Sequence, residues 1–97
     1  MLESEPKDVF LRYALAMEME KAAEIQPALD IHLELTKEDP PHIASFFRSA
    51  QILAQQEQIE PARSFLRDGI EQARGAGDFH AAAEMSEMLS QLGVFGE

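Results

Sequence analysis

The apolar residues of this chain recur at intervals of three and four positions, the spacing that places side chains on one face of an α-helix. Ala, Leu, Met, Glu, Gln and Lys dominate and β-branched residues are few, which favours helices over strands. Prolines and glycines interrupt the pattern at several points and divide the chain. We therefore predict an all-α protein with helices over about 7–22, 26–37, 40–56, 60–74 and 78–93.

Three signals mark the ends of these helices. Asp39 is predicted to cap the third helix, since Pro40 and Pro41 would then occupy a first turn that needs no amide hydrogen. Gly75 and Gly77 suit the end of the fourth helix, and Asp78 is predicted to cap the fifth. The short connections predict antiparallel neighbours.

The chain also resembles itself at an offset of about 34 residues, a period typical of stacked helix pairs. The segments 25–28 (Ile-Gln-Pro-Ala) and 59–62 (Ile-Glu-Pro-Ala) align at this offset, as do Tyr13 with Phe47 and Ala16 with Ala50. A helix pair of this period cannot enclose its own apolar face, so it must stack on a neighbour.

With this period, the sequence resembles tetratricopeptide repeat (TPR) proteins. The places of the repeat pattern are filled in the first unit by Leu15, Ala16, Met19, Ala28 and Pro40 and in the second by Phe46, Ala50, Leu53, Ala62, Leu66 and Gly69. The small residues among them let helix axes approach closely where they cross.

The sequence departs from the repeat pattern at several positions. Arg12 and His32 replace large apolar and aromatic residues, and the closing proline of the second unit is Arg74. Ala23 and Glu57 replace the turn glycines, so each turn must avoid or tolerate a positive φ angle.

The resemblance is closest to small bacterial TPR proteins with two repeats and a capping helix. It implies an α-α superhelix of five antiparallel helices forming a single domain over residues 1–97. The units would be a first repeat over about 8–41, a second over about 42–75 and a capping helix over about 78–93.

The resemblance further implies an interaction scaffold whose first helices line a concave groove. The partner-binding residues expected on this basis are Phe10, Tyr13, Met17, Glu20, Phe47, Gln51 and Gln55. These side chains favour an apolar or amphipathic segment of another protein, because the Lys, Asn and Arg that grip a terminal carboxylate in one TPR subclass are missing. In a structural interpretation, Tyr13, Met17 and Phe47 pack between helices, and Gln51 and Gln55 are merely solvated.

A second hypothesis is self-association. The first helix carries more apolar residues than one neighbour can cover, and two repeats are fewer than the ~3 that usually make a stable array. The surplus would then form a homodimer interface or belong to the groove.

The charge of the chain narrows its partners. Of its 97 residues, 18 are acidic and 8 are basic, giving a formal net charge of −10. This argues against nucleic acid and anionic membrane surfaces as ligands. We interpret most acidic residues as solvated faces, with attraction of a basic partner or adaptation to high salt as alternatives.

The segment at the start of the chain lacks the pattern of a signal peptide, and no apolar run reaches the ~18 residues of a membrane span. We therefore expect a cytoplasmic protein.

No constellation of residues points to catalysis. The chain has no cysteine, no glycine-rich phosphate loop and no serine in a Gly-x-Ser-x-Gly context. The histidines His32, His42 and His80 lack metal-ligand spacing, and His80 with Glu84 is typical of a solvated pair. We predict no catalytic residue, no metal, no cofactor and no enzymatic activity.

Overall fold

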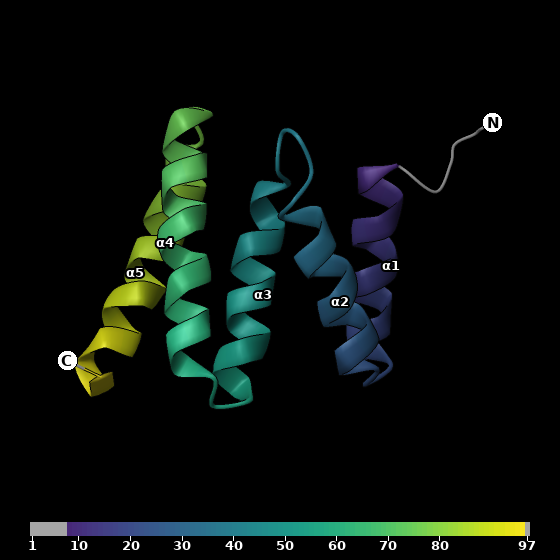
Figure 1. The fold of residues 1–97 in the computed structure, drawn as a ribbon, viewed down its shortest axis with the longest axis horizontal. Helices are drawn as coiled ribbons and strands as arrows, with labels where there is room; N and C mark the ends of the chain where they lie inside the picture. Colours follow the sequence, from purple (N-terminus) through teal and green to yellow (C-terminus); the bar gives the residue numbers. More distant parts are fainter. Residues whose placement is uncertain (1–7, 97) are drawn as a thin grey trace.

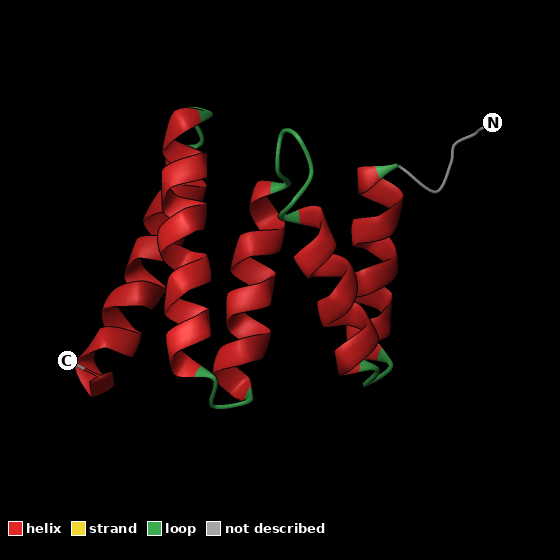
Figure 2. Cartoon of the chain, in the orientation of Figure 1, coloured by secondary structure: helices red, strands yellow, loops and turns green. Residues whose placement is uncertain are grey.

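The computed structural model describes residues 8–96, including the side chains of residues 8–93, and this part of the chain contains helices and no strand. Figure 2 shows them joined by short loops. The five helices are α1 (Val9–Lys21), α2 (Ile25–Leu35), α3 (Ile43–Gln55), α4 (Ile59–Gly75) and α5 (Phe79–Gly96). The predicted all-α class with five helices is confirmed. The expected start of the first helix at Lys7 lies outside the described residues.

The helices lie side by side in chain order, and each runs antiparallel to the one before it (Figure 1). Each helix packs chiefly on its neighbours in sequence, and α3 also touches α5. The α1–α2 pair forms one end of the row, and α4 and α5 form the other.

Two aspartates, Asp8 and Asp78, cap the N-termini of α1 and α5 with their side chains. The Asp8 carboxylate accepts a hydrogen bond from the Leu11 amide, and the Asp78 carboxylate accepts one from the Ala81 amide, each at 3.1 Å. The predicted cap at Asp78 is confirmed. Helix α5, however, continues past the predicted end at Gly93, because a glycine costs a helix only about 1 kcal/mol and Gly93 is buried within it.

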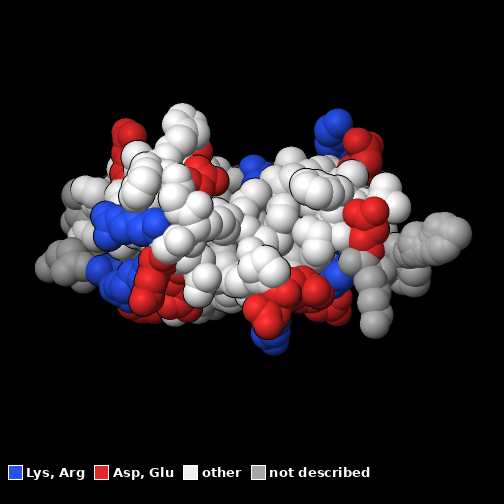
Figure 3. Space-filling view, turned by 90° about the horizontal axis from the view of Figure 1, so that it is seen from above, with Lys and Arg blue, Asp and Glu red and all other residues white. Residues whose placement is uncertain are grey.

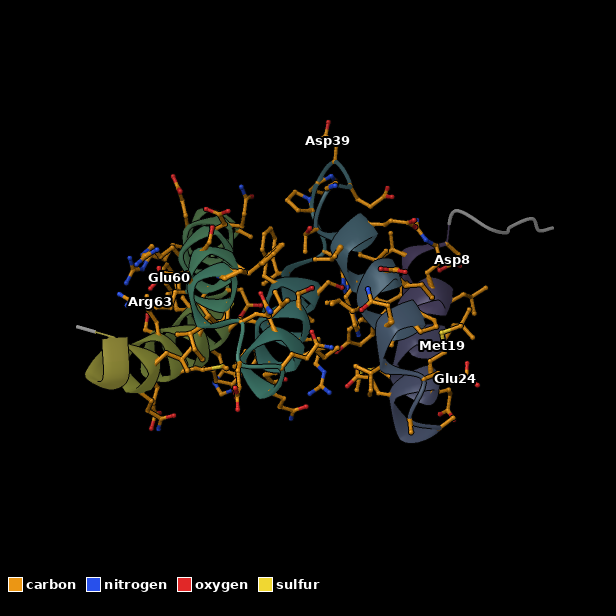
Figure 4. The ribbon with its side chains drawn as sticks, turned by 60° about the horizontal axis from the view of Figure 1, so that its bottom comes forward. Asp8, Met19, Glu24, Asp39, Glu60 and Arg63 are labelled. Carbon is orange, nitrogen blue, oxygen red and sulfur yellow. The ribbon has the colours of Figure 1, made fainter. Side chains whose placement is uncertain are left out.

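The predicted cap at Asp39 is wrong. Helix α3 begins only at Ile43, with His42 as its N-cap in extended conformation. A residue that precedes proline is disfavoured in helical conformation, so Pro40 cannot open a helix before Pro41. Figure 4 places Asp39 at the tip of the α2–α3 loop, which a hydrogen bond from the His42 amide to the Leu35 carbonyl closes at 3.0 Å.

The main hydrophobic cluster is built from α3, α4 and α5. Its buried members are Phe46, Ala50, Ala62, Leu66, Ile70, Ala73, Ala82 and Met85. The buried residues Ala16, Ala28 and Leu35 of α1 and α2 lie outside this cluster. All four alanines expected at helix crossings (Ala16, Ala28, Ala50 and Ala62) have no exposed surface.

The turns after α1 and α3 adopt a positive φ angle although they lack the glycine usual in the repeat pattern. Ala23 and Glu57 have φ angles of 64° and 63°, so both tolerate the left-handed conformation. The Glu24 amide bonds to the Met19 carbonyl, and the Gln58 amide to the Leu53 carbonyl, both at 2.8 Å. These six-residue closures are Schellman turns, in which glycine is the preferred residue at the left-handed position. The turn after α4 repeats the arrangement with Gly77 at φ 78°.

We expect Glu57→Gly to raise the free energy of unfolding by about 0.5–1 kcal/mol, because glycine removes the strain of a Cβ at positive φ. The greater conformational entropy of glycine in the unfolded chain offsets part of this stabilisation. Urea unfolding followed by circular dichroism measures the change. The matched control is Gln56→Gly, at a negative φ in the same turn, which should destabilise. Equal effects of the two substitutions would contradict this account.

Candidate functional site

A groove of about 590 Å³ opens between α3 and α5. Helix α4 packs closely against both of these helices, which touch each other only briefly, so their facing sides are left open. From α3 the groove is lined by Phe47, Arg48, Gln51, Ala54 and Gln55. From α5 it is lined by Glu84, Glu87, Met88 and Gln91.

The predicted partner-binding residues divide between two places. Phe47, Gln51 and Gln55 line the groove, whereas the four residues expected from α1 do not. Of the latter, Phe10 is 79% exposed on α1, and Tyr13, Met17 and Glu20 are half-buried. The binding role of all seven remains a prediction.

The groove combines an apolar floor with a polar rim. Phe47, Ala54 and Met88 are partly buried and pack against the main hydrophobic cluster. Gln55, Glu84 and Gln91 are exposed. This composition suits a segment with one apolar face, since methionine adapts to varied shapes and aromatic rings offer large contact area.

A polar network joins α1, α2 and α3 next to the groove. The Glu20 carboxylate pairs with the Arg48 guanidinium through Oε1 and with His32 Nε2 through Oε2, the latter at 2.9 Å. Ser45 Oγ lies 3.4 Å from His32 Nδ1 and 2.9 Å from His42 Nδ1. His32 has no exposed surface and Glu20 is 11% exposed, so the network is largely removed from water.

Tyr13 belongs to the same region. Its ring centroid lies 5.4 Å from that of His32 and 4.7 Å from that of His42. Burial raises the pKa of the Tyr13 hydroxyl, and the neighbouring Glu20 charge raises it further against the effect of Arg48. Tyr13 is thus half-buried against His32 and His42, and its role in binding remains a prediction.

The pKa values of three groups in the network are lowered. Burial lowers the pKa of His32 below 6.5, although its hydrogen bond to the Glu20 carboxylate opposes this effect, and burial also lowers the pKa of His42. For Glu20, burial acts to raise the pKa, but the hydrogen bonds and charges of Arg48 and His32 outweigh it, and the pKa falls below 4.5. At neutral pH these shifts favour a neutral His32 and an ionised Glu20.

The network is suited to structure rather than to chemistry. His32 is enclosed, so a substrate cannot reach its ring. Both ring nitrogens already have hydrogen-bond partners, a carboxylate and a hydroxyl. Among the described residues, no group of three or more His, Asp or Glu side chains is arranged to hold a metal ion. His80 Nε2 lies 3.4 Å from Glu84 Oε2, and both side chains are exposed, as a solvated pair would be.

Sequence reasoning missed the groove residues Arg48, Glu84, Glu87, Met88 and Gln91. The four on α5 share one helical face at spacings of three and four, which was the signal that could have found them. Arg48 adjoins Phe47 in sequence, but only the structure shows that its guanidinium turns toward Glu20.

A second exposed surface lies on α1. Phe10, Leu11 and Leu15 are 79%, 60% and 49% exposed. Arg12, by contrast, is turned toward α2, where its guanidinium lies 3.1 Å from Glu38 and 3.7 Å from Glu34. The apolar surplus expected on the first helix is thus present, and its use in a homodimer remains a prediction.

Charged side chains of opposite sign lie beside one another on the face in Figure 3 instead of forming a patch of one sign. Figure 4 shows a further pair on α4, where Arg63 lies next to Glu60, with 3.6 Å between Arg63 Nη1 and Glu60 Oε2. None of the helices within the described range is long and apolar enough to span a membrane.

Comparison with known proteins gives a structural match. The chain is similar to the solution NMR structure of a tetratricopeptide repeat domain protein from Salinibacter ruber, with a TM-score of 0.85 and 27% sequence identity. The match covers 92% of this chain and 90% of the other. No protein-family model matches the sequence, and no curated protein matches it. The resemblance to small TPR proteins and the TPR-like fold are therefore confirmed.

Proposed function

We propose that this TPR-like chain is a non-catalytic interaction module that receives an amphipathic segment of another protein in the groove between α3 and α5. A TPR-like fold indicates a protein-interaction module in general, and the groove supplies a specific place for the contact. The observation that carries the proposal is the partly buried pair Phe47 and Met88, which faces an open groove of about 590 Å³.

The proposal retains only part of the predicted surface. Phe47, Gln51 and Gln55 remain in it, joined by Met88 and the other groove residues of α5. Tyr13 and Glu20 are omitted because their side chains are engaged in the network with His32. An amphipathic helix would place its apolar face on Phe47 and Met88, and its polar flanks would meet the amides and carboxylates of the rim.

Selection from a displayed library of random 16-residue segments tests this proposal. Enriched segments are resynthesised, and their Kd is measured by fluorescence anisotropy. We expect Phe47→Ala to weaken binding about tenfold or more, because a central buried aromatic residue carries much of the energy of such contacts. The control is Phe79→Ala, since Phe79 is 67% exposed and does not line the groove.

A second variant guards against a folding defect in Phe47→Ala. Gln55 is exposed at the groove, so Gln55→Trp fills the groove without disturbing the core. Circular dichroism confirms that both variants are folded. Failure to enrich any segment, or equal binding to wild type and both groove variants, would overturn the proposal.

A further inference from the structure

Among the described residues that line the groove, Arg48 is the one cation, and it is already paired with a carboxylate. Arg48 Nη2 pairs with the Glu20 carboxylate, and Arg48 Nη1 donates a hydrogen bond to Gln51 Oε1 at 2.6 Å. The Glu20 side chain is 11% exposed and the Arg48 side chain is 29% exposed, so a ligand in the groove would meet a guanidinium that is already paired. Arg48 therefore gives the groove little attraction for an anion.

The acidic groups of the groove are not neutralised. Glu84 and Glu87 are exposed on α5, three positions apart and therefore on one face of the helix. Glu84 contacts His80, and Glu87 has no ion-pair partner among the described residues. No described Lys or Arg lies within ion-pair distance of either carboxylate.

From this imbalance we infer that the occupant of the groove is a basic amphipathic segment of a partner protein, with apolar residues on one face and Lys or Arg along one edge. The inference rests on the proposed function and adds the charge of the partner. The apolar face would cover Phe47 and Met88, and the basic edge would meet Glu84 and Glu87. Acidic segments would be repelled by the same two carboxylates.

Three synthetic helical peptides with identical apolar positions test the inference. Their edge positions carry Lys and Arg, Gln, or Glu, and their Kd values are measured by fluorescence anisotropy at two salt concentrations. We expect the basic peptide to bind about tenfold more tightly than the Gln peptide at low salt, with the advantage shrinking as salt rises. The Glu peptide should bind most weakly.

A matched pair of double variants separates the groove from the overall charge of the chain. E84Q/E87Q removes the two rim charges, and D68N/E71Q removes two exposed charges at the same spacing on α4, outside the groove. We expect E84Q/E87Q to weaken binding of the basic peptide about tenfold and to change the affinity of the Gln peptide much less. D68N/E71Q should change either affinity less than twofold.

Each contrary result has a distinct meaning. Equal losses from the two double variants would show that overall charge attracts the peptide, and the inference would be wrong. If the Gln peptide binds as tightly as the basic one and Phe47→Ala weakens both, the charge selection is wrong while the proposed function stands. If the basic peptide does not bind, the inference is overturned, and the display selection still decides the proposed function.

Discussion

Glu20→Ala is expected to lower the free energy of unfolding by about 2–3 kcal/mol, the largest effect among the substitutions considered. The change removes the carboxylate that pairs with Arg48 and with His32, and it leaves both inside the protein. Breaking a buried ion pair from one side costs about 3–5 kcal/mol. The figure expected here is smaller because Arg48 is 29% exposed and regains some hydration. Urea unfolding at pH 7 measures it.

The control for this substitution is Glu18→Ala, two positions earlier on α1. Glu18 and its partner Lys21 are about 70% exposed or more, so their ion pair contributes only a few tenths of a kcal/mol. A loss with Glu18→Ala as large as that with Glu20→Ala would contradict the role given to the network.

The pH profile of stability gives a second readout of the same network. The pKa values of His32, His42 and Glu20 are all lower in the folded protein, so the unfolded chain binds more protons as the solution becomes acidic. The contribution of these histidines to the free energy of unfolding is therefore fully present above pH 6.5. It decreases below pH 6.5, because protonation of the histidines favours the unfolded chain. Stability falls further below pH 4.5 as Glu20 is protonated. Glu20→Gln should flatten the second fall, which a merely steric role of Glu20 would leave unchanged.

Gly69→Ala is expected to lower the free energy of unfolding by about 2 kcal/mol. Gly69 is buried on α4, and a Cβ added there would lie 2.6 Å from Met85 Sδ and 2.7 Å from Phe46 Cβ. The methionine side chain can turn aside, but Phe46 Cβ is fixed to the backbone of α3, so the two helices would have to separate. Overpacking of this kind costs about 3 kcal/mol, against a gain of about 1 kcal/mol from helix propensity.

Gly75→Ala is the matched control on the same helix. A Cβ at Gly75 would meet no atom within 4 Å, so the substitution should be neutral or stabilise by up to about 0.5 kcal/mol. Thermal unfolding would then separate the two variants by about 10 °C in Tm for a domain of this size. Similar melting of the two variants would contradict the close packing of α3 on α4.

The elements that sequence reasoning predicted well depend on local chemistry. Proline, glycine and aspartate act on the backbone within a few residues, so the end of α4 at Gly75 and the cap at Asp78 could be read directly. The error at Asp39 has the same local origin, because Pro41 disfavours a helical conformation at Pro40.

The candidate site was predicted only in part, because helical spacing fixes which residues share a face but not which way that face turns. Phe47 lines the groove from α3, whereas Glu20 is turned inward toward His32. The available signal for this inward turn was His32, which stands where the repeat pattern usually has an aromatic residue. A buried histidine needs polar partners, and Arg48 and Glu20 are 28 positions apart in sequence, too far for local pattern to join them.

The order in which the helices pack determines how a local destabilisation affects the rest of the molecule. Since each helix rests mainly on the helices beside it in sequence, stability is approximately a sum of nearest-neighbour terms along a line. A defect in α5 reaches α1 only by passing through α3, where the polar network meets the main hydrophobic cluster. Helix α3 thus couples the stability of the α1–α2 end to that of the α4–α5 end. The same helix supplies one wall of the groove.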